Sequence, residues 1–447
     1  MREGARGAWP LTGACLALAA LSLVLPWAIA FDPWAWLSWG RDVTRLDLDT
    51  AGGPSWKPLP VVATTLFALA GSAAPLLWLV VARAGGLLAL AGAAVLARRL
   101  AGPVAAVVAA AAMAITDWWL FNSALGNSEP LFAAATLWAI LAHLAGRHRA
   151  ALWLAVAAGL LRPEAWPFIG LYGLWLWRTR RTGLPELLLG AAVIAGLWFG
   201  PDLLGTGGAL GASDAAMGPG SAQSASNAAV PGLQVLADFA ELVTPPVLAA
   251  ALAGALLGGP VARGLGLGAL AWVLLVAVMT QAGFSGNPRY TVPAAALACV
   301  LAGVGVAALA RRAPAPAAGP ALGAVVLLAA LAFTAGDLAD QLDELGRRAD
   351  RRTQLTALVD RAGGPDRITA CAPVRTIQEM KSQLGWRLDV PLAHLTDAPR
   401  PPAVVFQVSP GYFGEPPGPP VPAGLEEVGR DGAWRLFAAC RDGARLG

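Results

Sequence analysis

The chain of 447 residues is strongly apolar: 57% of its residues are hydrophobic and only 13% are charged, and the mean hydropathy is +0.59. Soluble domains carry about 25% charged residues, so the composition excludes an ordinary soluble protein. The net charge of +4 and the pI near 9.2 would suit a nucleic-acid binder, but arginines at the ends of membrane helices explain them better. We therefore expect a polytopic α-helical membrane protein.

Recurrent apolar stretches predict about eleven membrane helices. Their expected bounds are 9–30, 75–97, 103–115, 130–145, 150–161, 166–177, 185–199, 243–257, 265–279, 292–309 and 321–334. The fifth and sixth are too short to cross a bilayer of ~30 Å alone. The first stretch could instead be a signal peptide that ends in a small-residue cleavage site, but its length favours a spanning helix.

Arginines occupy every second connection between these stretches. By the positive-inside rule these connections, and the N-terminus, lie in the cytoplasm. The alternate connections collect acidic side chains, namely Asp32, Asp117, Glu129, Glu164 and Asp202. We therefore expect the carboxylates to gather on the outer face of a bacterial plasma membrane. The odd number of helices then places the C-terminal region outside as well.

The C-terminal region differs from the rest of the chain. The charged segment 337–361 predicts a helix that leaves the membrane, and "RITACAPV", "AVVFQV" and "AWRLFAAC" read as strands. The sequence thus predicts a transmembrane catalytic domain over residues 1–335 and a small extracytoplasmic α/β domain over residues 336–447.

The four cysteines fall into two groups. Cys371 and Cys440 both lie in the predicted extracytoplasmic domain, where a disulfide is expected, with two buried free thiols as the alternative. Cys15 and Cys299 lie in apolar stretches and are expected to be packing residues. Residues 205–232, rich in Gly, Ala and Ser, predict a flexible outer loop that is either a lid or a passive connection.

Asp32 is the candidate catalytic residue. It follows the first apolar stretch and precedes Pro33, a pattern typical of a helix N-cap with proline at the first helical position. The following segment would then be an interfacial helix anchored by Trp34, Trp36 and Trp39. An aspartate held at a helix start is also well placed to react, so the structural and catalytic interpretations are compatible.

Four cationic side chains accompany this aspartate. Lys57 lies in "GPSWKPLPVV" at the expected membrane surface, and Arg83 lies inside an apolar helix, where a charge is costly and by default functional. Arg162 and Arg289 occur in "LRPEAWPF" and "SGNPRYTVPA". The structural alternative for Lys57 is a lysine that snorkels to the membrane surface, and for Arg83 it is an ion pair or a placement without a role. Several of the outer acids, such as Glu129 and Glu164, could instead serve helix ends. No nucleotide-binding loop is present, and the histidines lack the spacing of metal ligands.

The order of these groups resembles that in GT-C glycosyltransferases, multi-spanning enzymes that use polyprenyl-phosphate sugars. This superfamily includes protein mannosyltransferases and lipid A aminoarabinose transferases. The loop "FDPWAWLSWGRDV…GGPSWKPLPV" resembles the first outer loop of these enzymes, and "GNSEPLF", "LRPEAWPF" and "NPRYTVPA" are similar to later family stretches. The family often has an acidic pair after its first helix, whereas Pro33 follows Asp32 here. The second acid and any divalent cation are therefore left open.

The resemblance implies that a sugar is transferred, with inversion, from a polyprenyl-phosphate donor to a hydroxyl of a glycan, lipid or protein acceptor. Asp32 would act as general base. The donor phosphate would be bound by Lys57, Arg83, Arg289 and, less strongly, Arg162. The acceptor or sugar would be oriented by Asp117, Glu129, Glu164 and Tyr290. The composition suits a high-GC bacterium such as an actinobacterium, for which mannose or arabinose donors would be expected.

Two other functions fit the same residues. A transporter or flippase of lipid-linked glycans would also bind phosphate with surface cations, but it should show internal repeats, and none is evident. An inactive membrane subunit would leave Arg83 and the outer acids unexplained.

Overall fold

The computed structural model describes residues 8–116, 119–205, 224–313, 315–395, 401–409, 421–441 and 446. These residues divide into two compact units. The helical unit contains residues 8–24, 79–196 and 224–342. The mixed unit contains residues 25–78, 197–205 and the described residues from 343 onward. The predicted domain boundary near residue 335 stays a prediction.

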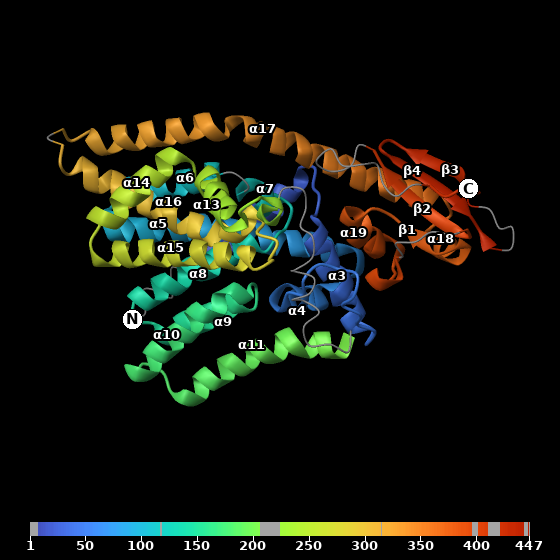
Figure 1. Cartoon of the computed structure of the whole chain (residues 1–447), viewed down its shortest axis with the longest axis horizontal. Helices are drawn as coiled ribbons and strands as arrows, with labels where there is room; N and C mark the ends of the chain where they lie inside the picture. Colours follow the sequence, from blue (N-terminus) through green and yellow to red (C-terminus); the bar gives the residue numbers. More distant parts are fainter. Residues whose placement is uncertain are drawn as a thin grey trace. The chain divides into compact units, whose positions relative to one another are not determined.

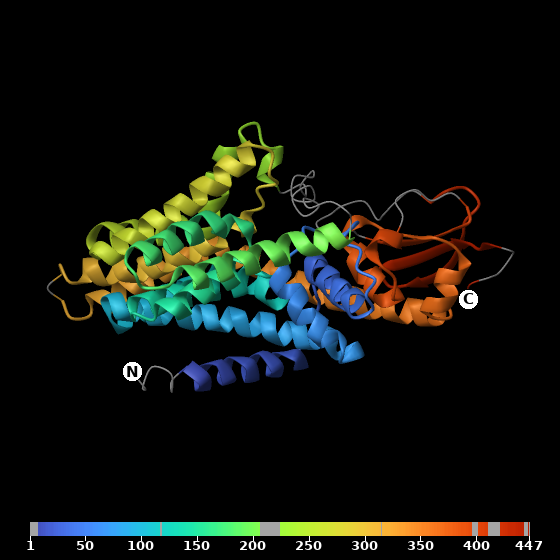
Figure 2. The ribbon, with the colours of Figure 1, turned by 90° about the horizontal axis from the view of Figure 1, so that it is seen from below.

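Helices make up the whole of the helical unit's regular structure (Figure 1). They are α2 (Ala8–Leu21), η1 (Ser22–Val24), α6 (Pro103–Ile115), α7 (Trp119–Ala124), α8 (Glu129–Leu144), α9 (His148–Gly159), η3 (Pro163–Ala165), α10 (Trp166–Arg178), η4 (Ala225–Asn227), α13 (Pro231–Val243), α14 (Pro245–Leu257), α15 (Pro260–Gln281), η5 (Pro288–Thr291) and α16 (Val292–Ala310). Most of α5 (Ala74–Ala101) and the first parts of α11 (Leu184–Gly205) and α17 (Ala318–Arg361) also belong to this unit. Figure 2 shows α2 running along α5, where Cys15 and Ala19 pack against Ala84.

The core of the helical unit is built around α16. All residues from 292 to 308 are buried, so this helix is surrounded by others on every side. Small residues let its neighbours approach closely: a Cβ atom on Gly305 would stand 1.9 Å from the Ala250 carbonyl oxygen of α14. Such backbone-to-backbone packing is typical of helices that associate within a membrane.

Five described helices are long and apolar enough to cross a bilayer. They lie within Gly71–Ala101, Leu184–Gly205, Pro260–Gln281, Pro288–Ala310 and Ala318–Arg361. The pair α13 and α14, bent by 96°, makes a sixth if it is one broken span, and four further apolar helices are shorter. The chain is a multi-pass membrane protein, and the expected number of eleven spans stays a prediction.

Two predicted helices differ from those in the structure. The helix expected over residues 9–30 is wrong in its last part, because α2 ends at Leu21 and η1 ends at Val24. Pro26 explains the break, since proline lacks an N–H and disfavours helical backbone in the residue before it. The apolar stretch 321–334 and the charged segment 337–361 form one uninterrupted helix, α17.

The mixed unit combines short helices with a small sheet (Figure 1). Its elements are α3 (Phe31–Thr44), α4 (Pro58–Ala68), η2 (Gly71–Ala73), α18 (Pro365–Cys371), β1 (Val374–Arg375), α19 (Gln378–Leu388), η6 (Leu392–His394), β2 (Ala403–Val408), β3 (Glu426–Asp431) and β4 (Trp434–Ala439). The strand order is β1-β2-β4-β3. Only the β1–β2 pairing is parallel among these strands.

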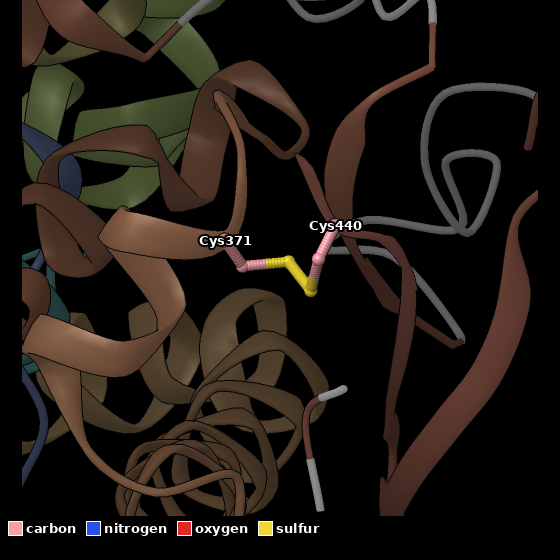
Figure 3. Close-up of a disulfide and its surroundings, with 2 residues drawn as sticks. All are labelled: Cys371 and Cys440. Atoms are coloured by element: carbon pink, nitrogen blue, oxygen red, sulfur yellow. A yellow bond between two sulfur atoms is a disulfide. The ribbon is translucent and has the colours of Figure 1, made fainter. Parts of the chain in front are cut away.

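Apolar side chains from the sheet and from α17, α18 and α19 form the core of the mixed unit, with Phe406 and Trp434 at its centre. The strands predicted from "AVVFQV" and "AWRLFAAC" are confirmed as β2 and β4. The strand predicted from "RITACAPV" is wrong, because Pro365 at a helix start sends this segment into α18, and only two residues of β1 follow. Cys371 and Cys440 form the expected disulfide (Figure 3), and Cys15 and Cys299 are buried free thiols.

Candidate functional site

Asp32 and Lys57 form a buried ion pair in the mixed unit. Asp32 lies in the first turn of α3, where the helix dipole favours a carboxylate, and Lys57 directly precedes Pro58 at the start of α4. The Lys57 Nζ atom lies 3.7 Å from the Asp32 Oδ2 atom and 5.1 Å from the centre of the Trp36 ring. Each residue is 7% exposed. The starts of α3 and α4 thus bring one anion and one cation together where little solvent reaches them.

Close packing of α3 against α4 fixes this pair. A Cβ atom on Gly40 would stand only 2.5 Å from the Thr64 carbonyl carbon, so only glycine permits this approach. The Thr64 hydroxyl donates a hydrogen bond of 2.6 Å to the Trp36 carbonyl oxygen of α3. Gly40 and Thr64 therefore allow the close packing of α3 and α4 that holds Asp32 and Lys57 in position.

Helix α19 contacts α3 along its length. The Ser382 hydroxyl donates to the carbonyl oxygen of Phe31, the residue before Asp32, at 2.7 Å. The Trp34 and Trp386 rings pack in a tilted arrangement, with 6.2 Å between ring centroids. At the other end of α3, the Arg41 guanidinium lies 2.8 Å from an Asp389 carboxylate oxygen. The C-terminal region therefore supports the helix that carries Asp32.

Two expectations about this stretch are wrong. Asp32 is not an N-cap: α3 begins at Phe31, its N-cap is Ala30, and Asp32 is the second helical residue. The three tryptophans of α3 are not interfacial anchors, because Trp34 is 5% exposed and Trp36 and Trp39 are fully buried. The physical reason is that α4 and α19 pack on α3 and take up the surface that a lipid interface was expected to cover.

A second charged cluster lies in the helical unit. The Arg162 guanidinium bonds to the Glu129 carboxylate and lies 3.2 Å from a Glu164 carboxylate oxygen. Glu129 opens α8, and Glu164 lies in η3. All three side chains are at most 3% exposed, so one buried cation is shared by two buried carboxylates. Because the three charges are so deeply buried, each depends on its partners.

Arg289 and Tyr290 join the same cluster from η5. The Arg289 Nε atom lies 3.8 Å from a Glu129 carboxylate oxygen, and the Arg162 guanidinium lies over the Tyr290 ring at 4.4 Å. The Tyr290 backbone accepts a 2.8 Å hydrogen bond from the Trp272 indole. Five of the predicted site residues are therefore brought together here. Arg289, with 22% of its side chain exposed, and Tyr290 are only partly buried, whereas Glu129, Arg162 and Glu164 are buried.

An apolar groove of about 530 Å³ begins beside this cluster. It runs between α8, α9, α10, α15 and α16. Near the cluster it is lined by Phe132, Ala165, Trp272 and Pro293, and elsewhere by His143 and Tyr172. A groove of this size and chemistry suits a hydrocarbon chain or another apolar ligand.

The remaining predicted residues lie apart from these clusters. Arg83 of α5 donates to the Ala124 carbonyl oxygen and to the hydroxyl and carbonyl oxygens of Ser22, so neutral acceptors satisfy its guanidinium N–H donors. Its role at a donor phosphate stays a prediction. Asp117 and residues 206–223 of the predicted loop lie outside the described residues. Across the described part of the chain, no three His, Cys, Asp or Glu side chains are grouped to hold a metal ion.

Comparison with solved structures identifies the fold. The chain matches the crystal structure of ArnT from Cupriavidus metallidurans bound to undecaprenyl phosphate with a TM-score of 0.61, over 98% of this chain and 99% of that one, at 15% identity. It matches the apo structure of the same protein with a TM-score of 0.62, over 98% of each chain, also at 15% identity. The chain has the fold of ArnT. The GT-C-like fold class predicted from the sequence is confirmed. No protein-family model and no curated protein matches the sequence.

Sequence reasoning missed the contribution of the C-terminal region to this site. Ser382 and Asp389 carry no motif, and they contact residues about 350 positions earlier in the chain. The only sequence signal was the "GRDV" pair, Arg41 and Asp42, which had no assigned partner. The structure shows that Arg41 pairs with both Asp42 and Asp389.

Proposed function

We propose that this protein is a membrane glycosyltransferase that moves a sugar from a polyprenyl-phosphate donor to an acceptor hydroxyl. The observation that carries the proposal is the buried Asp32–Lys57 pair within a chain that has the ArnT fold. The ArnT structure is described as bound to undecaprenyl phosphate, which supports a donor of the same chemical class. The reaction is placed at the outer membrane face because the predicted topology puts Asp32 there.

Asp32 is the general base of this reaction. Its carboxylate takes the proton from the acceptor hydroxyl while the hydroxyl oxygen attacks the anomeric carbon. The bond between that carbon and the phosphate oxygen breaks, and polyprenyl phosphate leaves with the electron pair. Attack from the face opposite the phosphate inverts the anomeric centre. The hydrogen bond from the Ser382 hydroxyl to the Phe31 carbonyl oxygen supports this role, because it fixes the first turn of α3, which carries the Asp32 carboxylate.

Lys57 is the residue that stabilises the leaving phosphate. It is already near Asp32, and its ammonium has the charge and the buried setting that make such stabilisation strong. Arg289, expected from the sequence to bind the donor phosphate, stays a prediction; within the helical unit its side chain is the most exposed cation of the Glu129 cluster. Arg162 and Glu164 are more deeply buried, which supports a structural role that orients Arg289 and Tyr290.

The apolar groove supports a lipid-linked donor. Its lining is almost entirely hydrocarbon and aromatic, and Ala165 and Pro293 place it next to Glu164 and Tyr290. A polyprenyl chain in the groove would bring its phosphate toward Arg289.

A turnover assay separates this proposal from a transporter or flippase. Purified protein in nanodiscs is incubated with radiolabelled polyprenyl-phosphate mannose or arabinose and candidate acceptors, and released polyprenyl phosphate is quantified. We expect the sugar–phosphate bond to be cleaved with one of these donors. Binding of the lipid without cleavage across the acceptor panel, together with lipid translocation in proteoliposomes, would contradict the transferase and favour the flippase.

A further inference from the structure

A pocket of about 600 Å³ lies at the turn between α10 and α11, away from the residues assigned above. It is lined by Arg178, Arg180 and Arg181 together with Trp177, Thr182 and Leu184. The two helices that meet here are apolar, and α11 is long enough to span a bilayer. The pocket is therefore positioned where the ends of membrane helices emerge.

The positive charge of this turn has no acidic partner among the residues that the structure describes, because none of the three arginines forms an ion pair there. The acid nearest in sequence, Glu186, is engaged elsewhere: it accepts from the Arg149 guanidinium at 3.0 Å and from the Trp153 indole at 3.1 Å. Three exposed arginine residues thus line one pocket with no described anion of their own, which favours an anionic ligand.

Thr182 gives a second, independent indication of a ligand. The residue is 8% exposed, and its hydroxyl oxygen finds no hydrogen-bond partner among the described residues. A buried hydroxyl without a hydrogen-bond partner destabilises a protein. A pocket-lining threonine in this state suits a ligand oxygen that accepts a hydrogen bond from its hydroxyl.

The backbone of the turn is strained at Arg180. Its φ of 54° is in the left-handed region, which favours glycine over residues that carry a side chain. The Arg180 and Arg181 amides bond back to the carbonyl oxygens of Trp177 and Leu176 at 3.0 and 2.9 Å, as at a helix C-terminus. Glycine would suit the backbone at this position better. The presence of arginine there therefore supports a role for its side chain.

Exposed apolar side chains flank the pocket on both helices. On α10 Leu174 and Trp177 are 41% and 52% exposed, and on α11 Leu184 and Leu188 are 50% and 59% exposed. A polar, cationic pocket with apolar surface on either side matches a molecule that has an anionic head and hydrocarbon chains.

We propose that this pocket binds the headgroup of an anionic phospholipid. The phosphodiester pairs with Arg178, Arg180 and Arg181, a phosphate oxygen accepts from the Thr182 hydroxyl, and the acyl chains lie along the exposed leucines of α10 and α11. A free phosphate ion shares the headgroup chemistry but gains nothing from the apolar flanks.

The test compares lipid retention by matched variants. Full-length protein in mild detergent is mixed with equal amounts of phosphatidylglycerol and phosphatidylcholine, and bound lipid is counted by native mass spectrometry. The test variant is Arg180→Gln/Arg181→Gln. The control is Arg311→Gln/Arg312→Gln, which removes two exposed arginines after α16 that do not line the pocket. We expect the wild type and the control to retain phosphatidylglycerol selectively, and the test variant to lose roughly fivefold in affinity per arginine.

Two further measurements make the test decisive. Arg180→Gly relieves the strained φ, so it should fold at least as well as the wild type and still bind phosphatidylglycerol more weakly. Inorganic phosphate at millimolar concentration should not displace the lipid. Equal retention by the wild type, Arg180→Gln/Arg181→Gln and Arg180→Gly would overturn the proposal. Equal losses in the control and the test variant would also overturn it, because they would reflect net charge alone. Displacement by inorganic phosphate would reassign the pocket to a soluble anion.

Discussion

Replacing Arg162 by methionine should destabilise the helical unit more than any other single change in the Glu129 cluster. Arg162 contacts Glu129 and Glu164, and these carboxylates are 0% and 1% exposed. Removing the cation leaves both carboxylates buried, and only Glu129 has Arg289 in reach, at 3.8 Å. Loss of one partner of a buried ion pair costs about 3–5 kcal/mol. Glu129→Gln should cost less, about 1–3 kcal/mol, because Arg162 keeps Glu164 and the amide can still accept a hydrogen bond.

The assay is thermal unfolding of both single variants and of Glu129→Gln/Arg162→Met in the same detergent. Because the double variant removes one of the two carboxylates that lose Arg162, it should be more stable than Arg162→Met alone. Gly13→Ala is a control that should not destabilise the protein, since a Cβ atom there meets no other atom within 4 Å and alanine favours the helix. Equal melting temperatures for Arg162→Met and the wild type, or strictly additive losses in the double variant, would refute the account of Arg162 as a shared cation.

Three further predictions concern the mixed unit. Gly40→Ala should lower its stability by about 1–3 kcal/mol and reduce turnover, because its Cβ atom would stand 2.5 Å from the Thr64 carbonyl carbon; unchanged melting and turnover would contradict the packing of α3 on α4. Cys371→Ser/Cys440→Ser should lower stability by up to about 4 kcal/mol, since the disulfide closes a loop between residues 69 positions apart; reducing agent should destabilise only the wild type. Arg430 and Arg435 lower the pKa of Glu427 from 4.5 to about 2, so its stabilising effect is complete above pH 4.5 and is lost as the pH falls toward 2. The melting temperatures of the wild type and Glu427→Gln should therefore converge as the pH is lowered from 6 to 3, and a constant difference would be inconsistent with this pKa.

Patterns local in sequence predicted much of the fold. The helix expected over residues 103–115 has the bounds of α6, and that expected over residues 292–309 ends one residue before α16 does. Apolar stretches bounded by proline and arginine are sufficient for this, because in a membrane helix the backbone satisfies its own hydrogen bonds. The strand "AVVFQV" was predictable for a similar reason, since β2 is buried almost throughout.

Contacts between distant segments were not predictable. The segment "RITACAPV" is rich in β-branched and small residues, yet the proline at its upstream edge starts a helix. The tryptophans of α3 were assigned to a lipid interface because nothing in the sequence places α4 and α19 over them. The sequence singled out four members of the second cluster separately: Glu129, Arg162, Glu164 and Tyr290. Only the packing of α8, η3 and η5 shows that they share one network.

The role of Asp32 is the central claim, and one comparison tests it most directly. Sugar transfer from a polyprenyl-phosphate donor is measured in nanodiscs for the wild type, Asp32→Asn and Asp47→Asn, with donor binding measured in parallel. Asp47 is an exposed aspartate shortly after α3, so its variant controls for loss of a carboxylate near the same helix. We predict that Asp32→Asn binds the donor and loses at least 100-fold in turnover, in line with the roughly 10²–10⁴-fold contribution of a general base, while Asp47→Asn behaves as the wild type. Turnover that survives in Asp32→Asn would contradict the account and leave Asp32 as the structural ion-pair partner of Lys57.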